Sequence, residues 1–146
     1  MAFVDNSVGA IECDAVLEHV QDPDRVLREF ERILRPGGYL HVVVPFIHPY
    51  HAYPEDFRCW TEDGLKRTLS RFDIVASGVR TGPAATLLVV LLEFIRMMAP
   101  RPLRGAVYVA AGWVLWPLRY LDRWLLRLPD AHVLANSIYV LARKRV

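Results

Sequence analysis

Cysteine is scarce in this chain of 146 residues, which contains only Cys13 and Cys59. Two cysteines cannot form the disulfide framework of a small secreted domain, and no charged-then-apolar leader opens the chain, so we expect a reducing, cytoplasmic environment. Long apolar runs are missing as well. The uncharged apolar stretches Thr81–Leu92 and Gly105–Leu118 are shorter than the roughly 18–20 residues of a membrane-spanning helix, so we expect no transmembrane span.

Lysine is also scarce, with 2 lysines against 16 arginines. The net charge is +2, but residues 1–73 hold 8 basic and 13 acidic side chains, whereas residues 74–146 hold 10 and 3. An apolar fraction of 53% and a charged fraction of 23% exclude a disordered chain, and the length favours a single domain. The basic residues lack the density of a phosphate-tracking surface, so we expect no nucleic-acid partner.

A strand, a capped helix and a second strand follow one another within residues 8–44. The run Val8–Val16 is rich in Val and Ile, which favours a strand. Asp22 can cap the exposed amides of a helix, and Pro23 suits its first position. One apolar stripe marks this helix: Val26, Leu27, Phe30, Ile33 and Leu34. Because Pro36-Gly37-Gly38 ends the helix and Tyr39–Val44 predicts a buried strand, we expect a βαβ unit with parallel strands.

The rest of the chain predicts a loop, a helical insertion and a final strand. Phe46–Trp60 shows no periodicity and leaves the carboxyl end of a sheet strand, where ligands bind in open α/β sheets. A helix over about 61–69, a strand over 72–78, helices over 83–99 and 104–128, and a strand over 137–142 follow, with Pro117 kinking the second long helix. The apolar run Leu87–Leu92 favours a helix buried on more than one side. We therefore expect an α/β fold with a mixed, mostly parallel sheet and a helical insertion before the last strand.

Three segments carry a resemblance to a known family: Phe3–Ser7, Ala15–Pro23 with the sequence AVLEHVQDP, and Arg32–Leu40 with the sequence RILRPGGYL. At this spacing they resemble the class I S-adenosylmethionine-dependent methyltransferases, in particular the small-molecule branch called type 11. Pro54–Thr61 also resembles a stretch of that family. The resemblance implies the C-terminal half of a Rossmann-like methyltransferase fold in a single domain over 1–146, with 1–80 as core and substrate loop, 83–130 as a helical lid, and 136–143 as the final strand.

The resemblance implies S-adenosylmethionine as the cofactor, yet the family's Gly-rich cofactor turn precedes the matched region. The eight glycines of this chain contain no GxGxG arrangement. The resemblance leaves only a rim for cofactor contact, formed by Glu12, Cys13 and Asp14, so we expect this chain alone to bind the cofactor poorly or not at all. A separate N-terminal half or a second copy of the chain is the partner we expect.

Histidines around the loop are the candidates for chemistry. A neutral His19 can take a proton from a nucleophilic substrate, or it can order the loop together with Glu18. His48 and His51, with Asp56 nearby, suit either a metal site or hydrogen bonds to a substrate, and without a helix to align the rings we favour the hydrogen bonds and predict no metal. We thus predict His19, His48, His51 and Asp56 as catalytic residues and Arg58 and Thr61 as substrate contacts. Acids flank Cys13, which favours a packing role over a nucleophilic one.

The resemblance implies methyl transfer to a small-molecule substrate, and the apolar segment 83–128 favours a hydrophobic or lipid-linked one. A non-catalytic remnant or an interaction module is the alternative. Within this segment, aromatic residues and arginines are interleaved, a mixture typical of a bilayer interface: Trp116, Arg119, Tyr120, Arg123, Trp124 and Arg127. Peripheral contact with a membrane surface is therefore a further prediction.

Overall fold

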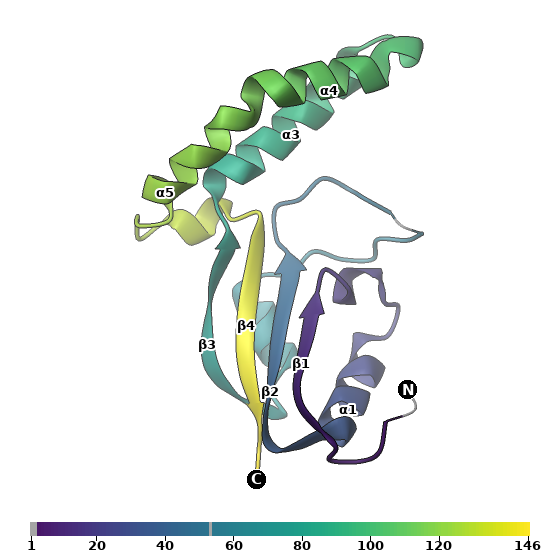
Figure 1. The fold of residues 1–146 in the computed structure, drawn as a ribbon, viewed down its shortest axis with the longest axis vertical. Coiled ribbons are helices and arrows are strands. Elements are labelled where there is room, and N and C mark those ends of the chain that lie inside the picture. The colour runs from purple at the N-terminus through teal and green to yellow at the C-terminus, as the bar shows by residue number, and fades with distance from the viewer. Residues whose placement is uncertain (1–2, 53) are drawn as a thin grey trace.

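The computed structural model describes residues 3–52 and 54–146 and shows a four-stranded sheet with a helical arm at one end (Figure 1). The strands are β1 (Val8–Asp14), β2 (Leu34–Pro45), β3 (Phe72–Thr81) and β4 (Ser137–Lys144). Their order across the sheet is β1-β2-β4-β3. The last strand of the chain therefore lies inside the sheet, between β2 and β3.

The sheet is mixed, but it is not mostly parallel. β1 and β2 pair in parallel, as the βαβ spacing predicts, whereas β4 runs antiparallel to both β2 and β3. The α/β prediction is confirmed, and the prediction of a mostly parallel sheet is wrong. The reason is topological: the segment between β3 and β4 leaves and re-enters the sheet at the same end, so β4 must run back between two strands that share the opposite direction (Figure 1).

The helix α1 (Pro23–Ile33) begins where the sequence predicts, because Asp22 Oδ1 accepts a hydrogen bond from Arg25 N at 3.0 Å and Pro23 takes the first position. β2 begins earlier than expected. Its first residue, Leu34, pairs with Val8, and a register irregularity accommodates residues 35–38 before Tyr39 pairs with Ala10. Gly37 within that irregularity has a φ of 74°, a conformation that glycine adopts without strain.

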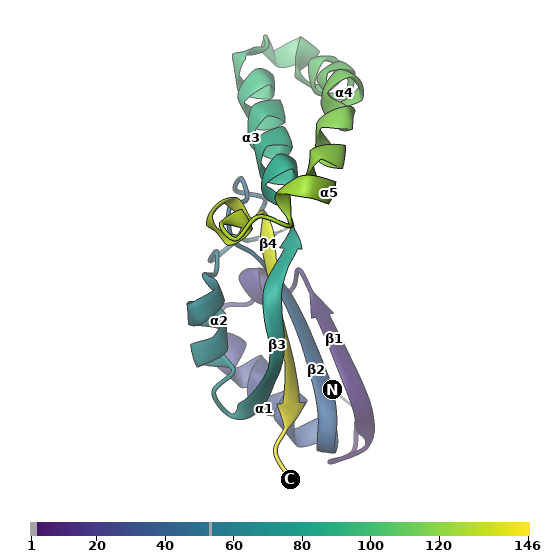
Figure 2. The same ribbon diagram turned by 90° about the vertical axis from the view of Figure 1, so that its left-hand side faces the viewer.

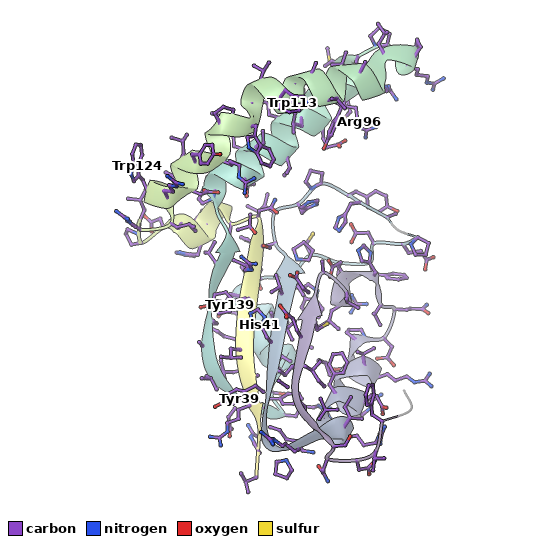
Figure 3. The ribbon with its side chains drawn as sticks, in the orientation of Figure 1. Tyr39, His41, Arg96, Trp113, Trp124 and Tyr139 are labelled. Atoms are coloured by element: carbon purple, nitrogen blue, oxygen red, sulfur yellow. The ribbon has the colours of Figure 1, made fainter. Side chains whose placement is uncertain are left out.

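Helices cover only one face of the sheet. α1 and α2 (Glu62–Thr68) lie on the same side (Figure 2), where Leu27, Phe30, Leu65 and Leu69 pack against strand residues in one core. The opposite face carries Tyr39, His41 and Tyr139 (Figure 3). There the rings of His41 and Tyr139 lie 5.8 Å apart, and His41 Nδ1 lies 3.6 Å from Glu12 Oε1. This second face has no helix over it among the described residues.

Residues 83–134 form the structure that we call the helical arm. It consists of α3 (Pro83–Met98), α4 (Arg104–Leu115) and α5 (Asp122–Leu125), with the 3₁₀ helices η2 (Arg101–Leu103), η3 (Trp116–Leu121) and η4 (Ala131–Leu134). The helix predicted over 83–99 is confirmed. The helix predicted over 104–128 is interrupted by η3, which contains Pro117, because proline removes a backbone donor and crowds the preceding turn.

The arm packs less tightly than its sequence suggests. In Leu87–Leu92, Leu88 and Leu92 are buried, but Leu87 is 56% exposed and Val90 is 44% exposed. The prediction of burial on more than one side is therefore wrong, because α3 packs against α4, α5 and η3 and leaves its remaining surface open (Figure 2). Among the described residues, no helix combines the length and apolar character needed to cross a bilayer.

Candidate functional site

The carboxyl ends of β1 and β2 lie at the end of the sheet nearest the arm (Figure 1). Ala15, directly after β1, has a φ of 51°, and its N–H donates to Val43 O at 3.1 Å. A left-handed conformation at a residue other than glycine costs about 1–3 kcal/mol and often marks a functional site. The turn leads at once into the 3₁₀ helix η1 (Leu17–His19), where Leu17 and Glu18 are buried.

Glu18 is the most unusual residue of this region. Its side chain is fully buried, and neither carboxylate oxygen has a hydrogen-bond partner among the described residues. Burial raises the pKa of Glu18 and the charge of Asp56 adds to this, while its own backbone amide and the nearby His19 and His51 oppose the shift. Burying a carboxyl group without a hydrogen-bond partner costs free energy, so the position of Glu18 calls for a physical explanation.

Two imidazoles approach the Glu18 carboxylate. His19 Nε2 and His51 Nε2 lie 3.9 and 4.0 Å from the same oxygen, Oε1, and the two rings are 5.0 Å apart at an angle of 80°. His19 Nδ1 donates a hydrogen bond to Glu55 O at 2.6 Å, and His51 Nδ1 lies 3.2 Å from Asp56 Oδ2. Since a backbone carbonyl only accepts, Nδ1 of His19 carries a proton, and in the neutral ring Nε2 then carries a lone pair.

Backbone hydrogen bonds hold the loop Phe46–Trp60 to η1 and to the end of β2. Phe57 N donates to Glu18 O at 2.9 Å, and Trp60 N donates to Pro45 O at 2.9 Å. Asp56 further accepts from His51 N at 3.2 Å. These contacts bring the predicted residues His19, His51 and Asp56 together around Glu18.

Two hollows flank the loop. One, of about 190 Å³, is lined by ten residues: Asp14, Ala15, Glu18, Val43, Val44, Pro45, His48, His51, Asn136 and Ser137. The other, of about 260 Å³, lies beside Tyr50, Asp56 and Arg58. His48 lines both hollows, and its ring lies 4.5 Å from that of His51. The predicted residue His48 therefore lies next to the cluster rather than inside it.

Arg58 and Thr61 already have structural partners. Arg58 Nη2 donates to Gln21 O at 2.9 Å, and its guanidinium lies 5.8 Å from the centre of the Trp60 ring. Thr61 Oγ1 accepts from Gly64 N at 3.1 Å and caps α2. Their role as substrate contacts stays a prediction.

The three residues predicted at the cofactor rim do not all converge, because strand alternation points Cys13 away from its neighbours Glu12 and Asp14. Glu12 is exposed on the open face beside His41, and Asp14 lines the first hollow. Cys13 is buried in the core, where burial, with smaller contributions from the charges of Glu18 and Asp14, raises its pKa to about 11. Its predicted packing role agrees with this position.

Glu18 and Asn136 were not among the predicted site residues. Asn136 is buried, donates through Nδ2 to Ile47 O at 2.9 Å and lines the first hollow, although it comes from the far end of the chain. The sequence carries a signal for Glu18, since it is an acid directly after the apolar run Ala15-Val16-Leu17. It carries none for Asn136, whose position depends on where β4 enters the sheet.

Comparison with known proteins identifies relatives of this chain. The family model described as a methyltransferase domain matches residues 1–42. The chain is 34% identical to a demethylmenaquinone methyltransferase of Streptomyces avermitilis over 118 residues, which cover 80% of this chain and 47% of that protein. It is 33% identical to the demethylmenaquinone methyltransferase of Mycolicibacterium paratuberculosis over 132 residues, which cover 90% of this chain and 54% of that protein. The chain thus spans about half the length of these curated relatives.

The fold agrees with these relationships. The structure of the [4+2]-cyclase SpnF aligns with this chain at a TM-score of 0.56 and 20% identity, and the alignment covers all of this chain and 53% of the SpnF chain. At that identity the likeness shows the shared fold and says nothing about the reaction.

Proposed function

Because this chain belongs to the class I S-adenosylmethionine-dependent methyltransferases, we propose that it forms the substrate side of a methyltransferase acting on a small, apolar acceptor. The proposal rests on one observation: His19, His48 and His51 lie close together at the carboxyl ends of β1 and β2, beside a hollow. Ligands bind at such strand ends in open α/β sheets. The apolar acceptor is supported by the demethylmenaquinone methyltransferases among the relatives.

The described residues do not fit a complete S-adenosylmethionine site. Glu12 and Cys13 point to opposite faces of the sheet, and the 146 residues contain no GxGxG arrangement. We propose that the residues that hold the cofactor lie outside these 146 residues.

On the acceptor side, the proposed base is His48. It lines both hollows, and its Nδ1 lies 2.8 Å from Pro49 O, so Nδ1 donates and Nε2 of the neutral ring carries a lone pair. A neutral imidazole in this position takes the proton that the acceptor atom loses on methylation. His19, His51 and Asp56 hold the loop in place beside it.

The test uses a fusion protein. In the Streptomyces avermitilis methyltransferase, a segment precedes the region matched by this chain, and that segment is fused to the N-terminus of this chain. We expect the fusion to transfer labelled methyl groups from S-adenosylmethionine to a demethylated quinol, and the chain alone to bind S-adenosylmethionine weakly or not at all. His48→Ala should lower the rate roughly 10²–10⁴-fold, whereas the control His132→Ala, in η4, should not. A fusion that binds S-adenosylmethionine but methylates no apolar acceptor would favour the non-catalytic interaction module instead.

Contact with a membrane surface is a second candidate function, favoured by the exposure of large apolar side chains on the arm. Trp113 is 81% exposed, Met98 is 74% exposed and Trp124 is 69% exposed. Arg119 lies 4.1 Å from the centre of the Trp116 ring, which places a cation beside an aromatic group. With anionic vesicles, we expect the tryptophan emission to shift to the blue, and the shift to be lost in a Trp113→Ala, Trp124→Ala double variant. An unchanged wild-type spectrum at saturating lipid would contradict this function.

The outer edge of β1 is the proposed contact for another chain or segment. β1 ends the strand order, so its outer backbone groups have no strand partner among the described residues, and unpaired edges invite strand addition. We expect light scattering coupled to size exclusion to show self-association or aggregation of the isolated chain. A sharp monomer of 16.8 kDa that unfolds cooperatively would contradict this proposal.

A further inference from the structure

When it is ionised, the buried Glu18 carboxylate has no described lysine or arginine beside it to compensate its charge. It has no solvent exposure, and neither of its oxygens accepts a hydrogen bond from a described residue. An ionised carboxylate taken out of water without a partner costs several kcal/mol, so buried carboxylates are paired with cations or bind metals. No lysine or arginine pairs with Glu18 among the described residues; the groups there that can carry a positive charge within 4.0 Å of it are His19 and His51.

In their neutral forms, the two histidines present lone pairs to Glu18. Nδ1 of each ring faces an oxygen acceptor: Glu55 O at 2.6 Å for His19, and Pro49 O at 3.2 Å for His51, with Asp56 Oδ2 also 3.2 Å away. The Nδ1 proton of each neutral ring is therefore engaged, and Nε2 faces Glu18 with its lone pair. At 3.9 and 4.0 Å from Oε1, these nitrogens are too far away for hydrogen bonds.

We propose that Glu18, His19 and His51 bind a divalent metal ion, most suitably Zn²⁺. One ligand atom from each residue lies within 4.8 Å of the other two. In a tetrahedral zinc site with bonds of about 2.1 Å, ligand atoms lie roughly 3.4 Å apart, so side-chain shifts of about 1 Å close the site. Two imidazoles and one carboxylate are a donor set that zinc accepts in proteins, and the ion supplies the positive charge that Glu18 lacks.

The surroundings hold both imidazoles as a metal site requires. Histidine ligands usually donate their second ring N–H to a carboxylate or a backbone carbonyl, which fixes the tautomer and the ring orientation. His19 does so with Glu55 O, and His51 with Pro49 O at 3.2 Å, while the Asp56 carboxylate lies 3.2 Å from the same His51 nitrogen. The same loop therefore supplies one ligand, His51, and the positioning oxygens for both rings.

The proposed ion joins two segments that are far apart in the sequence. Glu18 and His19 belong to η1, and His51 belongs to the loop. Three protein ligands leave a fourth position for water or for an acceptor atom, and Glu18 and His51 both line the hollow beside His48. The inference goes beyond the proposed function, because metal binding is measured without cofactor, substrate or methyl transfer.

The test uses the full chain without an affinity tag, freed of metal by a chelator. We expect calorimetry to show one zinc ion per chain, and Co²⁺ to give the intense visible absorption of a tetrahedral site. Glu18→Gln and His51→Ala should weaken zinc binding by roughly 100-fold or more, and Asp56→Asn, which affects only ligand positioning, by roughly 10–100-fold. His132→Ala removes an imidazole elsewhere and should bind zinc like the wild type.

Each other outcome overturns the proposal. A folded wild-type chain that takes up no zinc at millimolar concentration has no such site, and equal uptake by Glu18→Gln and His51→Ala places the metal elsewhere. Circular dichroism reports whether Glu18→Gln is folded; if it is not, His51→Ala, altered in a partly exposed loop side chain, decides the question. Zinc should also raise the midpoint of thermal unfolding of the wild type, but not that of His51→Ala. Failure of methyl transfer in the fusion leaves these binding results unaffected.

Discussion

The sheet with α1 and α2 buries its apolar side chains, whereas the helical arm leaves most of its own in solvent. The core cluster joins residues of η1, α1, α2, the residues flanking them and all four strands, and includes none from 83–134. In the arm, α3 has four buried residues, and α4 and α5 have none. The two regions have comparably apolar stretches of sequence, so composition alone does not show which apolar segment forms a core and which forms a contact surface.

The largest expected difference is in core truncation. Leu27 is fully buried between α1 and the sheet, so Leu27→Ala should lower the free energy of unfolding by about 2–5 kcal/mol. Val114, 76% exposed on α4, is the comparison site in the arm. Val114→Ala should change the free energy of unfolding by no more than about 0.5 kcal/mol. Chemical denaturation measures both values. Equal losses would mean that the arm is buried in solution and would remove the contrast between the regions.

A smaller loss of stability is expected at the contact between α5 and the first turn of α3. The Asp122 carboxylate accepts hydrogen bonds from Ala84 N at 2.8 Å and Ala85 N at 3.1 Å, and so caps α3 from α5. Asp122→Ala should lower the free energy of unfolding by about 0.5–2 kcal/mol, the usual loss when a helix cap is removed. Hydrogen exchange should show faster exchange of the Ala84 and Ala85 amides, with Leu40 and Val42 in the sheet unchanged. Faster exchange in both regions would show that the arm and the sheet open as one unit.

The smallest effect concerns an ion pair of the sheet region. Glu62 accepts hydrogen bonds from Lys66 Nζ at 2.5 Å and Ser77 Oγ at 2.7 Å, which lower its pKa below the ordinary 4.5. A carboxyl group whose pKa is lowered by folding stabilises the fold above its unfolded pKa, and this contribution is lost as the pH falls through the folded pKa. Glu62→Gln should therefore reduce the loss of stability on acidification by less than about 1 kcal/mol. Thermal unfolding at a series of pH values measures this loss of stability. An identical pH dependence in Glu62→Gln and the wild type would show that Glu62 does not contribute to it.

Local structure was predictable where one residue type determines it. Asp22 and Pro23 fixed the start of α1, and Pro117 marked the interruption after α4. The direction of β4 was not predictable in this way. A run such as Ser137–Ala142 has the same alternation whether it lies parallel or antiparallel to its neighbours, and only the path of the arm decides between them.

The candidate site was predictable in its location and incomplete in its members. The histidines and Asp56 stood out because they follow the carboxyl ends of sheet strands, where ligands bind in open α/β sheets, and the structure brings His19, His51 and Asp56 together. Glu18 was seen only as a partner that orders the loop. Its complete burial depends on the left-handed turn at Ala15 and on the loop folding over η1, which no local pattern encodes.

The central position of β4 has a consequence for the order of events during synthesis. β3 pairs only with β4, so after residue 81 has left the ribosome this strand still has no neighbour, and the arm must be made before one arrives. Until residues 137–144 emerge, the apolar side chains of β3, such as Phe72, have an incomplete surface on which to pack. Such contacts between distant segments slow folding and expose aggregation-prone strands meanwhile. Ribosome-bound chains stalled before residue 137 should therefore be readily cleaved by protease within β3, and chains released after residue 144 should resist cleavage there.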